Sequence, residues 1–274
     1  MQRQHKEFEA PEALQDSIRC FWYERRDFEE QQSSIEVLPD GYAEIIFHFG
    51  SSCSISYNGS LQPLPSPFMM GLLNQPIHVY TERRLEVIGI RCYPWMVFDL
   101  LGLPSDKNSV HIFEHPLARL QSKLNEFVEE GRIESAIDHV KQHFLDARSR
   151  VAVDSMLFKA GVAMRAANGA IPVSQVAAAA HATVRTLERS FKQSSGYTVK
   201  DVSGLIRFEQ VRNKLWLYPD ANIAGLAHEM GYTDQSHLSR EFKRYSGTTP
   251  AAFARKIKKR KQTISDDFVA FIQA

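Results

Sequence analysis

Four side chains between positions 185 and 192 have the types and the spacing that recognition of a nucleic acid requires. Arg185, Glu188, Arg189 and Lys192 follow one another at i, i+3, i+4 and i+7, which predicts one stripe on the face of a helix. An arginine fork can donate to O6 and N7 of guanine, a glutamate can accept from a cytosine amino group, and a lysine can bind a phosphate. An ordinary solvated helix face has a similar composition, so one stripe does not decide between the two interpretations.

The chain repeats this pattern 51 residues later. The first copy contains Leu187, Arg189, Phe191, Lys192, Ser195 and Gly196, and the second contains Leu238, Arg240, Phe242, Lys243, Ser246 and Gly247. In the second copy the outer stripe consists of Ser236, Ser239, Arg240 and Lys243, whereas Leu238, Phe242 and Tyr245 face inward. Duplication in register favours the binding interpretation.

A short apolar helix is predicted before each copy of the repeat. The two helices span residues 173–180 and 223–230, and a brief turn separates each from the helix that follows. Each half is therefore predicted to be a helix–turn–helix unit. Thr183 and Thr233 lie where the second helices begin, and their hydroxyls are expected to act as caps.

At its carboxy-terminal end the sequence resembles the DNA-binding domain of the AraC/XylS family of transcription regulators, over about residues 155–261. The most specific stretches are Leu226-Ala227-His228-Glu229-Met230-Gly231-Tyr232, then residues 234–243, and finally Gly247-Thr248-Thr249-Pro250. The resemblance implies two helix–turn–helix units joined by a long helix, here residues 199–217, with each second helix in the major groove of double-stranded DNA. The buried side of the long helix would consist of Val202, Leu205, Ile206, Phe208, Val211 and Leu215.

Position along the second helices predicts what each polar side chain contacts. The amino-terminal end of a recognition helix enters the groove deepest, which favours base or phosphate contacts for Gln235 and Ser236. Arg185, Arg189 and Arg240 are candidates for guanine, whereas Glu188 either accepts from cytosine or pairs within its helix. Residues further along are expected at phosphates. The DNA-binding candidates are Arg185, Glu188, Arg189, Lys192, Gln235, Ser236, Ser239, Arg240, Lys243 and Arg244.

One residue departs from the family pattern at the first turn. His181 stands where glycine is usual and where the second unit has Gly231. The position often needs a positive φ, which costs a non-glycine residue roughly 1 kcal/mol. The first unit is therefore expected to be less stable or slightly re-aimed.

Charge is divided unequally along the chain. Residues 171–274 carry 16 Lys and Arg against 9 Asp and Glu, whereas residues 1–170 carry 17 against 23. A basic module joined to an acidic one favours a polyanionic partner for the basic part, because its cations release counterions from phosphates. The run of residues 255–261 either adds non-specific DNA affinity or forms a solvated tail.

Before this module, a small β domain is predicted. Strands are expected at residues 43–49 and 85–92, with turns at Pro39-Asp40-Gly41 and Asn58-Gly59. In the first strand the side chains of Ile45, Phe47 and Phe49 share one face. The segments Cys20-Phe21-Trp22, Leu38 to Glu44 and Gly89-Ile90-Arg91 are similar to the amino-terminal domains of one AraC-like subgroup.

A sensor domain would need a pocket with aromatic walls and a few polar groups. The candidates for effector binding are Trp22, Tyr42, Glu44, His48 and Arg91. The competing interpretation places the aromatic residues in the core and the charged ones at the surface. No paired metal-ligand spacing is present, so no metal is expected. No P-loop or dinucleotide fingerprint is present either, so no other cofactor is expected.

A helical hairpin is predicted between the β domain and the basic module. Leu117, Leu120, Leu124 and Phe127 follow helical spacing, as do Ile133, Ile137, Val140 and Phe144, and Gly131 separates the two groups. The hairpin could cover the sheet, transmit a signal or form a homodimer.

The fold class is accordingly α+β, with three segments. Residues 1–150 are expected to form a sensor, regulatory or dimerisation domain, residues 151–262 the tandem helix–turn–helix domain, and residues 263–274 a tail. No segment has the ~20 apolar residues that cross a bilayer, and the start of the chain lacks a signal-peptide core, so a cytoplasmic, nucleoid-associated protein is expected. Three cysteines at unrelated spacings fit reduced thiols.

The function predicted from these features is sequence-specific DNA binding in transcription regulation, without catalysis. Expected partners are promoter DNA, RNA polymerase, a small-molecule effector and a second copy of the chain. Two alternatives remain open for the amino-terminal half. It could be a transferase with Cys92 or Cys20 as nucleophile, or a protein-interaction domain.

Overall fold

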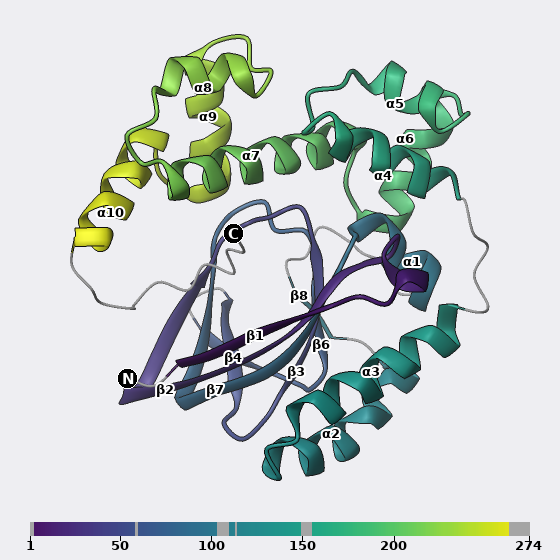
Figure 1. The fold of residues 1–274 in the computed structure, drawn as a ribbon, viewed down its shortest axis with the longest axis vertical. Helices are drawn as coiled ribbons and strands as arrows, with labels where there is room; N and C mark the ends of the chain where they lie inside the picture. Colours follow the sequence, from purple (N-terminus) through teal and green to yellow (C-terminus); the bar gives the residue numbers. More distant parts are fainter. Residues whose placement is uncertain (1–2, 58–59, 103–109, 113, 149–154, 263–274) are drawn as a thin grey trace.

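The computed structural model describes residues 3–57, 60–102, 110–112, 114–148 and 155–262. A curled antiparallel sheet forms the amino-terminal part, a helical hairpin covers one of its faces, and a helical domain lies along one end of the sheet (Figure 1). This arrangement confirms the predicted α+β class. The expected domain boundary near residue 150, the turn at Asn58-Gly59 and the tail at 263–274 lie outside the described residues.

The sheet has eight strands in the order β1-β2-β7-β3-β6-β8, and β4 pairs with both β5 and β7. The strands are β1 (Arg3–Glu9), β2 (Ile18–Val37), β3 (Ala43–His48), β4 (Cys53–Tyr57), β5 (Ser60–Leu64), β6 (Phe68–Met70), β7 (Ile77–Cys92) and β8 (Val110–His111). Alternate side chains of one strand enter different cores: Phe21 lies in the core beneath the hairpin, and Trp22 in the core on the opposite face. Both faces of the sheet are therefore apolar.

The predicted strands at 43–49 and 85–92 correspond to β3 and the second half of β7, and the long strands β1 and β2 are among those that were not predicted. β2 is the longest strand, but the charged stretch from Arg25 to Glu30 breaks the alternation by which a strand is recognised. β1 pairs with β2 along its whole length and has an almost fully exposed burial pattern. An exposed edge strand shows little hydrophobic patterning in a sequence.

The helical hairpin is confirmed, and packing against the sheet is its visible role. It comprises α2 (Leu120–Glu129) and α3 (Ile133–Arg148), preceded by the 3-10 helix η2 (Pro116–Arg119). Phe144 is fully buried with its ring centroid 6.1 Å from that of Phe21 on β2. Leu124 and Ile137 are equally buried in the same core.

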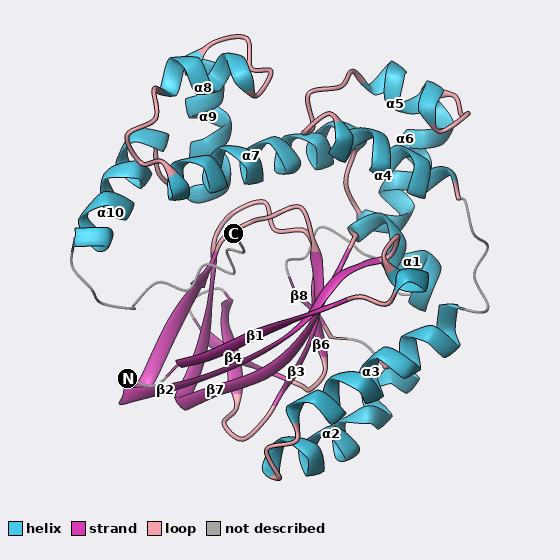
Figure 2. Ribbon diagram, viewed as in Figure 1, coloured by secondary structure: helices cyan, strands magenta, loops and turns pink. Residues whose placement is uncertain are grey.

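Helices dominate the rest of the chain, as Figure 2 shows. One short helix, α1 (Pro94–Leu101), follows β7, and the 3-10 helix η1 (Glu12–Leu14) precedes β2. The carboxy-terminal domain contains α4 (Met156–Ala166), α5 (Val173–Ala179), α6 (Val184–Ser195), α7 (Val199–Leu217), α8 (Ile223–Glu229), α9 (Gln235–Ser246) and α10 (Pro250–Gln262). None of the helices in the described part of the chain is long and apolar enough to cross a membrane.

The long helix α7 has the bounds that were predicted. Its six expected core positions, Val202, Leu205, Ile206, Phe208, Val211 and Leu215, are all at most 1% exposed. Thr198 and Asp201 form a capping box at its start, in which each side chain bonds the backbone N–H of the other residue. In Figure 1 the helix runs between the α5–α6 pair and the α8–α9 pair, which places the two units at its opposite ends.

Candidate nucleic-acid interface

Each helix–turn–helix unit buries one side of its second helix and exposes the other. Leu187 and Phe191 of α6 are fully buried. Leu238 and Phe242 of α9 are at most 1% exposed. The apolar spacing therefore orients both helices in the same way, as the repeat predicts. The opposite sides of the two helices carry the polar stripes.

Most of the predicted DNA-contact residues lie on these outward faces. Arg185, Arg189, Lys192, Gln235, Ser236, Arg240, Lys243 and Arg244 are exposed, whereas Glu188 and Ser239 are half-buried. Arg244 lies 3.6 Å from Asp201 of α7, with its guanidinium over the ring of Tyr245. The carboxylate of Glu188 accepts a 3.2 Å hydrogen bond from the backbone N–H of Val199.

Side-chain caps fix the starts of both second helices. The hydroxyl of Thr183 accepts from the N–H of Thr186 at 3.2 Å, as expected for an N-cap. In the second unit the expectation for Thr233 was wrong. The cap is Asp234, whose carboxylate accepts from the N–H of His237 at 2.7 Å, because the second turn is one residue longer.

The turns of both units contain a residue in the left-handed region. His181 has φ 52° and Gly231 has φ 71°, so the residue that departs from the family pattern adopts the conformation that glycine normally supplies. A Cβ on residue 231 would lie 2.7 Å from the Cβ of Ala170, which excludes a side chain there. The histidine side chain is exposed at its own turn.

Polar contacts attach the second unit to α7. Arg207 donates to both carboxylate oxygens of Glu241, at 3.3 and 3.1 Å, and to the carbonyl of Gly169 at 2.6 Å. Tyr232 donates to the same carboxylate at 2.8 Å, and burial together with Glu241 raises the pKa of its hydroxyl. These bonds join α9, the second turn and the linker helix.

The basic run at the end of the chain begins as part of a helix. α10 extends to Gln262, and Ile257 on its inner side is 1% exposed. Arg255, Lys258 and Lys259 are exposed on the same helix. A helical start of the run agrees better with an ordered cationic surface than with a fully frayed tail.

Four of the five effector candidates belong to a buried network. The indole N–H of Trp22 donates to Glu44 at 3.0 Å, and Arg91 contacts the same carboxylate at 2.7 Å and Asp40 at 3.2 Å. Tyr42 packs beneath the Arg91 guanidinium. The competing expectation that these charged residues lie at the surface was wrong, since Glu44 and Arg91 are 6% and 4% exposed.

His48 lies apart from this network. Its Nε2 is 3.1 Å from the carbonyl of Leu64, and its backbone N–H donates to Ser66. The structure thus does not bring all five candidates to one pocket. Among the residues that the structure describes, no group of three or more His, Cys, Asp or Glu side chains could hold a metal ion.

The network reaches across to the carboxy-terminal domain. Arg165 of α4 donates to the hydroxyl of Tyr42 at 2.9 Å and to the carbonyl of Gly41 at 3.3 Å. Arg212 of α7 donates to the carbonyl of Pro39 at 2.9 Å. Arg165 and Arg212 were missed in the sequence, because nothing local distinguishes them from solvated arginines.

A carboxylate of α7 completes this contact. Glu209 is 8% exposed and lies 3.9 Å from Arg165. Burial raises the pKa of the Glu209 carboxyl, and the Arg165 guanidinium opposes that shift. The loop from Pro39 to Tyr42 is therefore held against α4 and α7 by charged groups from both domains.

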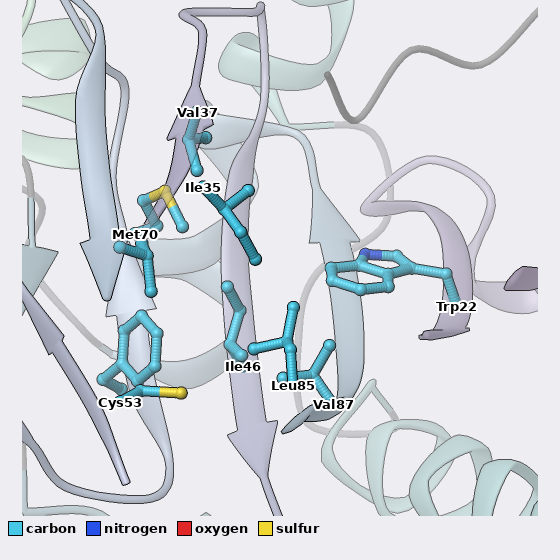
Figure 3. Close-up of a pocket in the computed structure, with 10 residues that line it drawn as sticks. Trp22, Ile35, Val37, Ile46, Cys53, Met70, Leu85 and Val87 are labelled. Carbon is cyan, nitrogen blue, oxygen red and sulfur yellow. The ribbon is translucent and has the colours of Figure 1, made fainter. Parts of the chain in front are cut away.

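An apolar cavity lies beside Trp22 inside the curled sheet (Figure 3). Its volume is about 20 Å³, little more than one water requires. The lining is entirely apolar: Trp22, Ile35, Val37, Ile46, Cys53, Phe68, Met70, Val79, Leu85 and Val87. Of the predicted effector residues, only Trp22 lines it.

The three thiols are all buried. Burial raises the pKa of the Cys53 thiol to about 11, and burial also raises the pKa of the Cys92 thiol. Cys20 is 3% exposed. A nucleophilic cysteine needs an accessible thiolate, so these positions do not fit the transferase alternative.

Comparisons with known proteins divide the chain in the same way. Residues 176–256 match the model of a helix-turn-helix domain, and residues 6–110 match a domain of unknown function (DUF6597). No curated protein sequence matches the chain.

Several solved structures are similar to the whole chain or to parts of it. A structure of ToxT from Vibrio cholerae has 11% sequence identity and a TM-score of 0.45, covering 93% of this chain and 98% of that one. ToxT from the same organism with a bound unsaturated fatty acid has 13% identity and a TM-score of 0.49, covering 85% and 94%. A xylose-binding transcription activator, xylR, has 21% identity and a TM-score of 0.33, covering 39% and 28%.

The matched stretch begins within α5 and contains both capped second helices, the linker helix α7 and the whole second unit described above. The chain thus carries a helix-turn-helix DNA-binding domain at its carboxy-terminal end, and this domain is similar to that of AraC/XylS transcription regulators.

Proposed function

We propose that the chain reads two adjacent major-groove segments, one with α6 and one with α9. The observation that carries this proposal is the tandem pair of capped helices at opposite ends of α7, each with its polar stripe outward. Centres of the two segments would be about one helical turn apart, on the order of 10 base pairs.

Within this interface the residues have separate roles. Arg185, Arg189 and Arg240 are exposed on the outward faces and would donate to guanine edges. Gln235 and Ser236, in the first turn of α9, would contact bases or phosphates. Phosphate contacts fall to Lys192, Ser239, Lys243 and Arg244.

The segment 151–262 would act as the DNA-binding domain and residues 1–150 as the regulatory domain, with 263–274 as a tail. Regulation would reach α4 and α7 through Arg165 and Arg212, whose guanidinium groups bond the loop from Pro39 to Tyr42. The buried network around Glu44 connects that loop to Trp22 at the apolar cavity. A small apolar effector, a second copy through the helical hairpin and RNA polymerase are the partners this arrangement would serve.

The test maps binding of the purified full chain across fragmented genomic DNA at fixed, near-physiological salt. An Arg189→Ala/Arg240→Ala variant removes one exposed arginine from each recognition helix. An Arg119→Ala/Arg132→Ala variant is the matched control, because it makes the same change in net charge at exposed positions of the amino-terminal domain. Comparing the two variants separates base contacts from general electrostatic attraction.

A shared motif of two boxes roughly one turn apart, lost in the first variant and kept in the control, is the expected result. Motif-free binding that both variants weaken equally would overturn the proposal. In that case the basic domain would bind DNA through charge alone.

A further inference from the structure

The two recognition helices bury equivalent phenylalanines against different partners. Phe191 of α6 and Phe242 of α9 occupy the same position of the 51-residue repeat. The Phe242 ring lies 5.0 Å from Phe208 of α7 and 5.5 Å from Phe253 of α10, measured between ring centroids. The second unit thus packs its phenylalanine within the carboxy-terminal domain.

In the first unit an aromatic partner comes from the amino-terminal domain. The Trp95 ring on α1 lies 6.2 Å from Phe191 and is stacked on Tyr93 at 5.4 Å. Trp95 is 2% exposed and belongs to the same core cluster as α4, α5 and α6. α1 also lies beside α4 and α6 in Figure 1.

The repeat explains why the first unit needs this partner. Shifted by 51 residues, Tyr245 and Phe253 of the second unit correspond to Ser194 and Val202 of the first, both fully buried but much smaller. Two aromatic side chains are therefore absent from the first unit's own sequence. Closely packed interiors do not leave such volumes empty, and a side chain from outside the unit must supply the missing packing.

Two further features join the first unit to the amino-terminal domain. A Cβ on Gly161 of α4 would lie 2.2 Å from the indole ring, so the absence of a side chain at 161 is what admits the tryptophan. Tyr197, just after α6, donates a 2.8 Å hydrogen bond to the carbonyl of Leu72 in the amino-terminal domain. At the second unit the equivalent position is Thr248, which lines an interdomain cleft of about 270 Å³ instead.

We propose that the amino-terminal domain completes the core of the first helix–turn–helix unit through Trp95 and thereby controls the order of α6, while the aromatic packing of α9 comes from carboxy-terminal residues. Regulation would then act on one of the two DNA segments. This consequence for DNA rests on the proposed two-segment function, whereas the dependence of α6 on Trp95 does not.

The test compares amide hydrogen exchange in peptides from α6 and α9 of the full chain without DNA. Trp95→Ala should raise the α6 exchange rate relative to α9 on the order of 100-fold, since the site cannot collapse fully around an emptied aromatic position. Tyr197→Phe keeps the ring, removes the bond to Leu72 and should raise the same ratio about fivefold. The Tyr197→Phe variant therefore tests the proposal even if the Trp95→Ala variant does not fold.

Phe144→Ala is the matched control, because it empties another fully buried aromatic position of the amino-terminal domain, against Phe21. It lowers overall stability and should leave the α6 to α9 ratio unchanged. An unchanged ratio in the Tyr197 variant, or equal changes in α6 and α9, would overturn the proposal.

Footprinting on a fragment recovered by genomic binding gives the second readout. Trp95→Ala should weaken protection of one box and retain the other. If the unmodified chain protects no pair of boxes, the two-segment function fails, and the exchange ratio still decides whether Trp95 completes the first unit. Equal loss of both boxes in a folded variant would contradict control through α6.

Discussion

The carboxylate of Glu188 on the first recognition helix accepts a hydrogen bond from the backbone N–H of Val199, the first residue of α7. An acid at this place satisfies a free N–H of the linker helix and lies at the positive end of its dipole. The contact joins the base-reading helix to the helix that spaces the two units. Positioning, rather than acceptance from cytosine, is the role we infer for this side chain.

Replacing Glu188 with alanine should therefore lower stability without changing base preference. Loss of a charge-assisted bond to a helix start is expected to cost ~1 kcal/mol in the free energy of unfolding. Denaturant unfolding measures that cost, and binding to a panel of single-base operator variants measures preference. If the Glu188→Ala variant instead tolerated substitutions at one particular base pair of the operator, Glu188 would be a base-contacting residue that accepts from cytosine.

Arg240 and Lys243 should behave differently on the same operator panel. Arg240→Ala is expected to cost ~1–3 kcal/mol at one base pair and to relax preference there. Lys243→Ala, one turn further along α9, should weaken every operator alike and reduce the salt dependence of binding. Uniform weakening by the arginine variant would show that it contacts a phosphate.

His181 and Gly231 occupy equivalent positions in the two turns, and substitutions at these positions should change the stability of the protein in opposite directions. His181→Gly removes a strained left-handed conformation worth ~1–2 kcal/mol, partly offset by the greater freedom of glycine in the unfolded chain. A net gain of up to about 1 kcal/mol is expected. Gly231→Ala should destabilise by more than ~1 kcal/mol, because its Cβ would lie 2.7 Å from that of Ala170. Thermal unfolding of both variants checks the pair, and destabilisation by His181→Gly would contradict the strain argument.

Two helical glycines provide a matched test of close packing. Gly161→Ala places a Cβ 2.2 Å from the nearest atom of the Trp95 ring and should cost ~1–3 kcal/mol or more. At Gly225 the nearest atoms to a new Cβ are 3.9 Å away, so alanine should stabilise α8 by up to ~1 kcal/mol. Urea unfolding measures the free energy of unfolding of both variants. Equal changes in the two would mean that the Trp95 side chain can move aside without cost.

The β1–β2 edge should respond to pH through His5. Hydrogen bonds to Glu24, and next to Glu7, raise the pKa of the His5 imidazole from 6.5 to about 9. Because the folded pKa is raised, the stabilisation is complete below about pH 6.5 and is lost as pH rises through about 9. The melting temperature of the unmodified chain should therefore fall toward that of His5→Gln between these values. Parallel curves for the two proteins would contradict this assignment.

The sequence predicted the carboxy-terminal domain in detail because the signals there are local and duplicated. The i, i+4 spacing of Leu187 and Phe191 sets which face of α6 is buried, so the exposed arginines follow. The cap at Asp234 was missed for two reasons. One extra turn residue moves the start of α9, and Thr233 and Asp234 are both residue types that commonly cap helices.

The amino-terminal half was less predictable because its polar residues act over long sequence separations. Arg91, Glu44 and Asp40 were visible as isolated charges, but their mutual pairing depends on the register of β3 and β7. Arg165 lies more than 100 residues from the tyrosine that it bonds. No local pattern predicts a partner at that distance.

The position of Trp95 bears on how such regulators can be recombined. A chimaera made by joining another sensor to this chain's residues after 150 would keep both recognition helices and leave α1 behind. Its first unit would meet whatever side chain the new sensor presented opposite Gly161. The boundary in the covalent chain is thus not the boundary of the packed unit, and a functional exchange must carry α1 together with the helices that it supports.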